Sequence, residues 1–262
     1  MTDQATYARR QYIVLAVLTP ALLLGGWMLA SERGWIGNVI LPSPVVVFGA
    51  LVDMVSNGYS GVGLFTHIGV SLARVLTAFV CGSILGTLCG VLRGRVRAAD
   101  ALLLVPAEML RPIPPLGIIP LFILWFGIGE LSKILLIFLS VFLITMVNAQ
   151  AGAANCPQDI LRAASTLGAS RWQTFRFAIL PAALPQIMTG LRLAMGSALS
   201  VLVASELLGG DRGLGFIVLD ASNFFRTAYV FAGVIVIGVI GFISDRGLAF
   251  LSRRLVHWQA RQ

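Results

Sequence analysis

Six long apolar stretches constrain this chain more than any other feature of its sequence. They are residues 12–30, 70–92, 101–126, 131–147, 187–208 and 228–243. Each comes close to the roughly 20 residues that an α-helix needs to cross the hydrocarbon core of a bilayer. Only 11% of the residues are charged, against about 25% in soluble domains. We therefore expect an all-α, polytopic membrane protein with about six transmembrane helices, forming a single membrane domain over residues 1–262.

The arginine and lysine residues indicate on which side of the membrane each connecting segment lies. If the chain starts inside, twelve of them fall in inner segments and four in outer segments. The inner residues are Arg9, Arg10, Arg93, Arg95, Arg97, Arg162, Arg171, Arg176, Arg246, Arg253, Arg254 and Arg261, and the outer residues are Arg33, Lys133, Arg212 and Arg226. Because positive residues gather on the cytoplasmic side, both termini and the segment 155–185 are expected in the cytoplasm. The same rule accounts for the net charge of +8 without a nucleic-acid partner.

Four glycines in the second stretch predict close helix packing. Gly82, Gly86, Gly90 and Gly94 recur at every fourth residue and therefore share one helical face. Small residues at this spacing let a second helix approach closely within a membrane. We expect a packing face here and no ligand site.

Prolines interrupt the third stretch at positions 106, 112, 114, 115 and 120. A regular helix cannot accommodate so many of them, and a broken backbone at membrane depth needs cover from protein or a water-filled cavity. Glu108 and Arg111 lie three residues apart in this stretch and share a helical face. Two interpretations stay open. Either the two side chains line a translocation path, or they pair with each other at its cytoplasmic entrance.

Glu206 is an acidic residue near the end of the fifth stretch. A charged side chain at the membrane centre costs roughly 2.5–3.5 kcal/mol. One interpretation is therefore that Glu206 faces a cavity or a partner and acts as a gate or hinge anchor. The other is that it lies near the outer end of its helix and reaches water or Arg212.

The segment 155–185 is neither a membrane span nor a simple turn, and its first half predicts a capped helix. Pro157 suits the first position of a helix, where its missing N–H is not needed. Gly168 is expected to end this helix in the left-handed conformation that glycine adopts without strain.

The second half of the segment predicts another short helix. Ser170 and Gln173 form an S-x-x-Q capping box at its start. Pro181 is expected to end it, and Pro185 is expected to open the next helix. Two capped helices in a polar connection indicate a docking element.

One motif in this segment resembles the EAA loop of the inner-membrane permease subunits of bacterial ABC importers, whose pattern is E-A-A-x3-G-x9-I-x-L-P. The matching residues are Ala163, Ala164, Gly168, Leu180 and Pro181. The chain departs from the pattern at Arg162, which replaces the glutamate, and at Ala178, which replaces the isoleucine. The resemblance implies that the loop inserts into a cleft of a cytoplasmic ATPase subunit. The expected coupling residues are Arg162, Ala163, Ala164, Gly168, Ser170, Arg171, Leu180 and Pro181.

Further motifs are similar to the nitrate, sulfonate, taurine and bicarbonate branch of these permeases. They are Leu41-Pro42-Ser43-Pro44, Ser71-Leu72-Ala73-Arg74, Arg111-Pro112-Ile113-Pro114-Pro115, Trp125-Phe126-Gly127-Ile128-Gly129-Glu130, Glu206-Leu207-Leu208 and Arg253-Arg254-Leu255 with Trp258. The resemblance implies a bacterial inner-membrane importer. It would contain two copies of this chain, two ATP-binding subunits and a periplasmic substrate-binding protein that largely sets the substrate.

The sequence shows no enzyme chemistry of its own. Its one lysine, Lys133, is not preceded by the glycine-rich sequence of a P-loop, so ATP hydrolysis is expected in a partner subunit. Neither H-E-x-x-H nor G-x-S-x-G occurs. We expect no catalytic residue, cofactor or metal, and we expect His67 at the membrane interface.

Together these features predict the permease of an ATP-driven importer for a small anion, taurine or another aliphatic sulfonate, which works by alternating access. An importer of the same class for nitrate, bicarbonate or an aromatic acid is one alternative. A stand-alone secondary carrier is the alternative from another class. It would need coupling-ion sites inside the spans and usually inverted repeats, and only Glu108, Arg111 and Glu206 offer charge for such sites.

Overall fold

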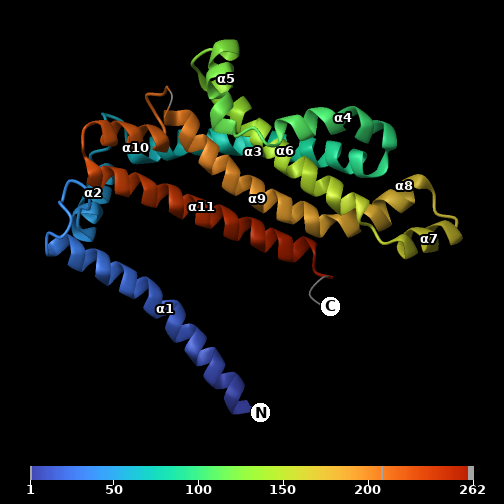
Figure 1. Cartoon of the computed structure of the whole chain (residues 1–262), viewed down its shortest axis with the longest axis horizontal. Coiled ribbons are helices and arrows are strands. Elements are labelled where there is room, and N and C mark those ends of the chain that lie inside the picture. The colour runs from blue at the N-terminus through green and yellow to red at the C-terminus, as the bar shows by residue number, and fades with distance from the viewer. Residues whose placement is uncertain (1, 208, 259–262) are drawn as a thin grey trace. The chain divides into compact units, whose positions relative to one another are not determined.

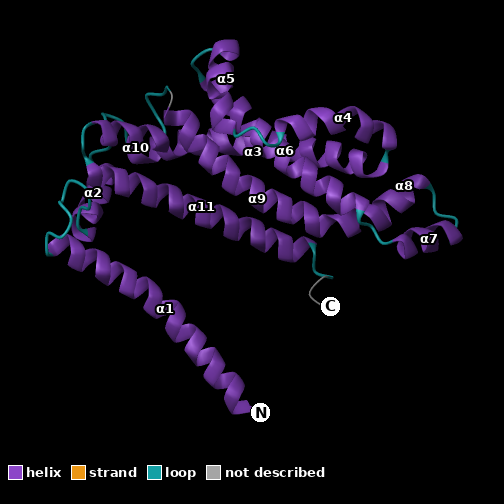
Figure 2. Cartoon of the chain, viewed as in Figure 1, coloured by secondary structure: helices purple, strands orange, loops and turns teal. Residues whose placement is uncertain are grey.

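The computed structural model of the protein describes residues 2–207 and 209–258, and helices make up most of this part of the chain (Figure 2). The helices are α1 (Thr2–Glu32), α2 (Pro44–Ser56), α3 (Leu64–Arg95), α4 (Arg97–Leu110), η1 (Pro115–Ile118), α5 (Ile119–Phe126), α6 (Glu130–Ala154), α7 (Gln158–Thr166), α8 (Arg171–Thr174), η2 (Phe175–Ile179), α9 (Leu180–Leu207), α10 (Leu214–Asn223) and α11 (Thr227–Leu255). Within the described residues, five helical segments are long and apolar enough to cross a membrane, or six with one bent pair. The predicted all-α fold with about six spans is confirmed.

Several helices extend beyond the apolar stretches that predicted them. α3 continues to Arg95 and carries Arg93 in its last turn, where cations interact favourably with the helix dipole. α11 likewise continues to Leu255, past the predicted end at 243. Hydropathy marks only the apolar part of a helix, whereas backbone hydrogen bonding continues into the polar flanks. The predicted end of the fifth stretch, Leu208, lies outside the described residues.

The chain forms two compact units. The N-terminal unit contains residues 1–64 and 217–235, and the main unit contains residues 65–216 and 236–262. Figure 1 labels the helices of both units. The predicted single membrane domain remains a prediction.

Aromatic and charged side chains hold the N-terminal unit together. The hydroxyl of Tyr59 donates to Asp220 over 2.8 Å, and the hydroxyl of Tyr229 donates to Asp53 over 2.6 Å. The guanidinium of Arg226 lies 5.3 Å from the ring centre of Tyr59 and 4.0 Å from that of Tyr229. Burial and the bond to Asp220 raise the pKa of Tyr59 to about 12, and the bond from Tyr229 lowers the pKa of Asp53. At neutral pH Tyr59 is therefore a neutral phenol and Asp53 a carboxylate.

α3 and α6 pack closely along the predicted glycine face in the main unit. A Cβ atom added at Gly86 would lie 2.7 Å from the carbonyl oxygen of Phe142. One added at Gly94 would lie 2.8 Å from the carbonyl oxygen of Gln150. The other two glycines of the row meet the α6 backbone in the same way. The prediction of a packing face is confirmed, since only glycine leaves room for this approach.

α9 also packs along α6. A Cβ atom at Gly152 of α6 would lie 2.8 Å from the carbonyl oxygen of Ala183 on α9. The buried core of the main unit draws its side chains chiefly from α3, α6 and α9. Its members are Val75, Ala78, Phe79, Ile119, Leu136, Ile137, Val141, Ala194, Met195, Ala198, Val201, Leu202 and Ala204.

The proline-rich third stretch is broken, as predicted. α4 ends at Leu110, and residues 115–126 continue at an angle of 88° to it. Figure 1 shows α5 standing away from α4. Residues 111–114 form the break, because Pro112 and Pro114 have no N–H to donate to the preceding turn.

Candidate functional site

The docking loop, residues 155–185, begins with the amphipathic helix α7. Pro157 lies one residue before the helix as its N-cap, with extended backbone angles, and not at the first helical position as predicted. Gly168 has φ +70° and donates its N–H to the carbonyl of Ser165 over 3.0 Å. This is the left-handed C-cap predicted for that position.

The predicted capping box starts α8. The side-chain oxygen of Gln173 accepts from the N–H of Ser170 over 2.8 Å, and the hydroxyl of Ser170 accepts from the N–H of Gln173 over 3.3 Å. Both orphan donors at the start of this helix are thereby satisfied.

The predicted stop at Pro181 is wrong. α8 passes through the π-turn η2 directly into α9, so residues 171–206 form one continuous helical segment. Pro181 and Pro185 both lie inside α9. A proline crowds the carbonyl four residues earlier. The wider π-turn, in which Leu180 N–H bonds the carbonyl of Phe175, comes just before and relieves this crowding at Pro181.

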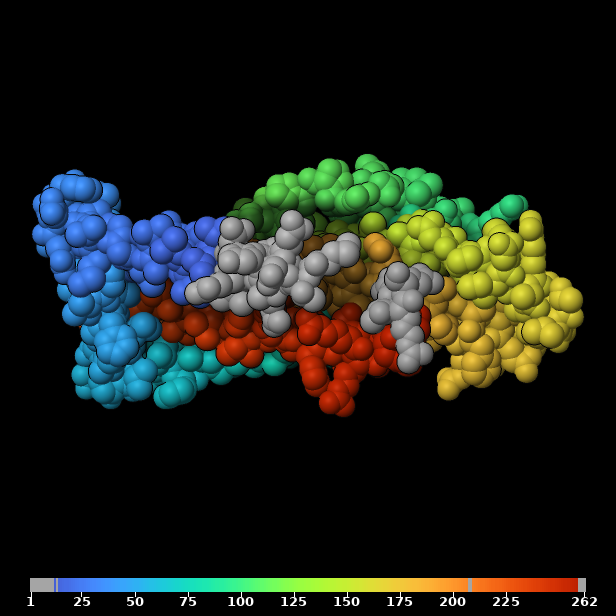
Figure 3. Space-filling model, turned by 90° about the horizontal axis from the view of Figure 1, so that it is seen from below, coloured from blue at the N-terminus to red at the C-terminus, as the bar shows by residue number. Residues whose placement is uncertain are grey.

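The surface of the docking loop is apolar and open. A hollow of about 550 Å³ is lined by Ile160, Ala163, Ala164, Leu167, Gly168, Ala169, Gln173, Thr174, Phe177 and Ala178. Leu167 is 85% exposed and Phe177 is 71% exposed. Figure 3 shows the loop, in yellow and gold, at one end of the main unit. A contiguous exposed apolar patch of this kind marks an interaction surface.

The charged side chains at the start of the docking loop form a loose, exposed ion pair. Arg162 lies 3.6 Å from Asp159 of its own helix, with both side chains more than three-quarters exposed. Such an exposed pair contributes little to stability. Arg162, which stands where the EAA pattern has glutamate, is therefore oriented toward solvent and available to another protein.

A second polar site lies at the other end of α9. Glu206 is 1% exposed, and its carboxylate accepts from Arg74 and from Ser71, each over 2.7 Å. The backbone N–H of Gly215 donates to the second carboxylate oxygen over 2.8 Å. Of the two interpretations of Glu206, the contact with water or Arg212 is contradicted by this burial, and the contact with partner residues agrees with it. Arg212 contributes only its carbonyl, which accepts from Arg74 over 3.0 Å.

Arg74 links this site to α6. Its guanidinium also donates to Glu130, whose side chain is 59% exposed. Lys133 lies 3.8 Å from the same carboxylate and is 6% exposed, although its place in the sequence predicted an outer turn. The buried charge cluster, as we name Arg74, Glu130, Lys133 and Glu206, joins α3, α6 and α9.

His67 belongs to the same region, and its predicted place at the membrane interface remains a prediction. It is 0% exposed, and its Nδ1 accepts from the N–H of Gly213 over 3.1 Å. A Cβ atom at Gly215 would lie 2.8 Å from the Cβ of Glu206. The segment after α9 therefore folds back onto the cluster through glycines. Sequence reasoning missed Arg74, although an arginine inside an apolar stretch is itself a signal.

The predicted pair of Glu108 and Arg111 is loose. Its closest charged atoms are 3.9 Å apart, and both side chains are more than half exposed. Arg111 lines a separate hollow of about 240 Å³, together with Ile113, Pro115, Ser140, Leu143, Ile144, Val147, Asn148 and Ser197. Glu108 is not among these lining residues.

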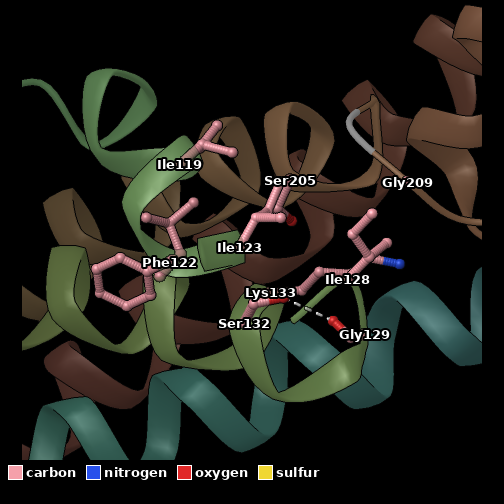
Figure 4. A pocket seen from close by; sticks show the side chains of 10 residues that line it. Ile119, Phe122, Ile123, Ile128, Gly129, Ser132, Lys133, Ser205 and Gly209 are labelled. Atoms are coloured by element: carbon pink, nitrogen blue, oxygen red, sulfur yellow. Dashed lines mark hydrogen bonds between the residues drawn. The ribbon is translucent and has the colours of Figure 1, made fainter. Parts of the chain in front are cut away.

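A smaller cavity lies between α5, α6 and the end of α9 (Figure 4). Phe122 and Ile123 face it from α5, and Lys133 and Ser205 face it from the other two helices. Its volume of about 20 Å³ suits about one water molecule, which excludes it as a solute site. Within the described residues, no group of three His, Cys, Asp or Glu side chains is placed to hold a metal.

Comparison with known proteins reveals similarity over nearly the whole chain. Residues 82–257 match the model of the family described as binding-protein-dependent transport system inner membrane component. The taurine transport system permease protein TauC of Escherichia coli (strain K12) is 40% identical, over 94% of this chain and 90% of its own length. The aliphatic sulfonates transport permease protein SsuC of Bacillus subtilis (strain 168) is 35% identical, over 93% and 87%. The nitrate import permease protein NrtB of Synechocystis sp. is 33% identical, over 93% and 90%.

Solved structures share the fold. A chain of the inward-facing MetNI methionine ABC transporter superposes with a TM-score of 0.57. It covers 79% of this chain and 97% of its own length at 18% sequence identity. A chain of an amino acid ABC transporter also gives a TM-score of 0.57, at 16% identity.

Proposed function

The chain belongs to the family of inner-membrane components of binding-protein-dependent transport systems, and on this premise we propose that it is the permease of an ATP-driven importer for taurine or another aliphatic sulfonate. The observation that carries the proposal is the 40% identity to the taurine permease over 94% of this chain. The second relative, named for aliphatic sulfonates, supports the same substrate class. The family's dependence on a binding protein argues against a stand-alone carrier.

ATP hydrolysis belongs to a partner subunit in this proposal, and the docking loop is the surface that the partner contacts. The loop presents an open apolar hollow and exposed side chains such as Trp172 and Phe177. Exposure of so much apolar surface to water is unfavourable, which supports contact with another protein. Each importer contains two copies of this chain, two ATP-binding subunits and one periplasmic binding protein. The excess of arginines in the inner segments supports a cytoplasmic location for the loop and both termini.

Motion of the ATP-binding subunit reaches the membrane through α9. Because residues 171–206 form one helical segment, a push on α8 moves α9 without an intervening flexible joint. α9 packs directly on α6, so displacement of α9 changes the contacts along the main unit. Alternating access follows if the ATP-bound partner binds the outward-open state more tightly than the inward-open state.

Glu206 serves as a hinge anchor at the far end of α9. Its bonds to Arg74, Ser71 and Gly215 hold this end to α3 and to the segment that follows α9. A carboxylate already saturated with donors does not bind an anionic substrate. Glu108 lies beside Arg111 as its loose partner and borders the path without lining the hollow that Arg111 faces.

Nitrate is the alternative substrate, since a nitrate import permease is 33% identical over 93% of this chain. Bicarbonate or an aromatic acid would fit the same importer class. The binding protein largely determines which substrate is imported, so the transport assay must include it.

The proposal is tested by reconstituting the chain in proteoliposomes with the ATP-binding subunit and the binding protein of its own cell. We expect uptake of labelled taurine that requires ATP and the binding protein, and that ethanesulfonate but not nitrate inhibits. Nitrate uptake without taurine uptake would move the assignment to the alternative substrate. Uptake driven by an ion gradient without ATP would overturn the importer proposal.

A further inference from the structure

The hollow beside Arg111 has the size and lining of a site for a small solute. Its volume is about 240 Å³, below the roughly 300–1,000 Å³ of pockets for drug-sized ligands. Three elements contribute to it: the break at residues 111–114 with the first residue of η1, the middle of α6, and α9. Most of its wall is aliphatic, and the polar groups are a guanidinium, two hydroxyls and one amide.

The two hydroxyls leave a proton for a ligand. Ser140 Oγ lies 2.7 Å from Ser197 Oγ, so their mutual hydrogen bond uses one of the two hydroxyl protons. Within the described part of the chain, neither serine bonds a carbonyl one turn earlier, whereas Ser200 and Thr189 of α9 do. A hydroxyl proton that does not satisfy its own helix is free to donate to an acceptor bound in the hollow.

Arg111 supplies the charge. Its contact with Glu108 is 3.9 Å long and exposed on both sides, which leaves most of its five N–H donors uncommitted. The planar guanidinium matches the oxygens of an oxyanion in a two-pronged geometry. An arginine in a membrane segment that faces a cavity is a functional site by default.

The broken helix gives an independent reason to place a ligand here. The backbone of the third stretch turns by 88° at residues 111–114, and transporters use such discontinuous helices to build substrate sites near the middle of the membrane. Asn148 closes the wall, but its amide is already bonded to the Ile144 carbonyl and to Gln186. The Asn148 amide keeps only its second N–H, so the guanidinium of Arg111 and the Ser140–Ser197 pair are the main donors.

We propose that this hollow binds the sulfonate group of the substrate during translocation, with the guanidinium of Arg111 and one hydroxyl of the Ser140–Ser197 pair donating to its oxygens. The inference rests on the proposed importer function and extends it to a site inside the permease. Because this site holds substrate only between binding and release, weak affinity suffices. The aliphatic wall contacts the carbon chain of an aliphatic sulfonate.

The test uses the complete reconstituted importer and measures taurine uptake and ATP hydrolysis in the same proteoliposomes. Arg111→Gln is expected to lower uptake by at least tenfold while ATP hydrolysis stimulated by the binding protein stays within twofold of wild type. Arg111→Lys is expected to retain part of the uptake, since lysine keeps the positive charge but lacks the planar, two-pronged donor geometry of the guanidinium. Arg97→Gln is the matched control, because it removes an exposed arginine from the other end of α4, and we expect normal uptake.

The double variant Ser140→Ala/Ser197→Ala provides a second test of the site. This test does not depend on whether the Arg111→Gln variant folds correctly. We expect a several-fold loss of uptake per ATP hydrolysed, with normal assembly of the complex. Normal uptake in both the Arg111→Gln and the double-serine variants would overturn the site while leaving the importer proposal intact. Absence of ATP-driven taurine uptake by the wild-type complex would overturn the taurine assignment and the sulfonate site with it, while ATP-driven uptake of nitrate in the same vesicles would keep the importer proposal.

Discussion

The docking loop and the buried charge cluster lie at opposite ends of α9 and differ in what completes them. In the loop, Leu167 and Phe177 are mostly exposed, and Arg162 has only a loose partner on its own helix. In the cluster, Glu206 is 1% exposed, and its carboxylate accepts from Arg74, Ser71 and the N–H of Gly215. The difference teaches that the chain itself satisfies the charges at one end of α9, while at the other end it leaves an apolar surface exposed. The proposed docking of a partner subunit on the loop, with an anchor at the far end of α9, would use this asymmetry.

The largest expected loss of stability comes from removing the Arg74–Glu206 ion pair. Arg74→Met leaves Glu206 buried without its counter-ion, and removal of one member of a buried pair costs about 3–5 kcal/mol of unfolding free energy. Glu130→Gln is the matched control, because Glu130 contacts the same arginine with a side chain that is 59% exposed. We expect that control to cost less than about 1 kcal/mol. Denaturation of the detergent-solubilised chain measures both, and equal losses would contradict the assignment of Glu206 as the buried partner.

The next largest effect is expected at the close contact between α3 and α6. Gly86→Ala places a Cβ atom 2.7 Å from the carbonyl oxygen of Phe142, which should destabilise the chain by about 1–3 kcal/mol through overpacking. Gly69 lies on the same helix with nothing within 4 Å of the added atom. Gly69→Ala should therefore be neutral or stabilising, by up to about 1 kcal/mol. Thermal unfolding of the two variants separates a packing effect from helix propensity, and a matching Tm change in both would argue against close packing of α3 on α6.

The sequence predicted the local features on both sides of this comparison. Gly168 and the Ser170–Gln173 box follow from neighbours within a few residues, and the glycine row follows from a spacing of four. The Arg74–Glu206 pair could not be predicted, because its members are 132 residues apart. Nothing in the neighbouring sequence indicates which buried charges pair. The continuity past Pro181 was also missed. The π-turn that permits it has no signal in the residue types alone.

A smaller effect is expected at the corner of the docking loop. Gly168→Val forces a β-branched residue into φ +70°, at a local cost of roughly 1–2 kcal/mol. The main unit should keep its stability, since the glycine has nothing within 4 Å. We expect the reconstituted importer to hydrolyse ATP without taurine uptake, because the two short helices no longer hold their angle. Coupled uptake at the wild-type rate would exclude a role for this corner.

The smallest effect tests the cap of α8. Ser170→Ala removes the acceptor for the N–H of Gln173 and should cost about 1 kcal/mol, confined to the first turn of that helix. Hydrogen exchange of the amides in residues 171–174 should accelerate by about fivefold, while amides of α6 keep their protection. Ser170→Asp is the control, since aspartate is an equally good N-cap and should restore slow exchange.

The most direct test of the central claim is co-purification of the ATP-binding subunit with the chain from its own membranes in mild detergent. The account predicts that the partner accompanies the wild-type chain in equal amount and is lost from Leu167→Asp, which places a charge in the apolar hollow. The Tm of the isolated chain should not change, because Leu167 is 85% exposed. Gln158→Glu adds the same charge at the first residue of α7, outside the hollow, and should keep the partner. Equal recovery of the ATP-binding subunit with Leu167→Asp and with wild type would contradict the docking role of the loop.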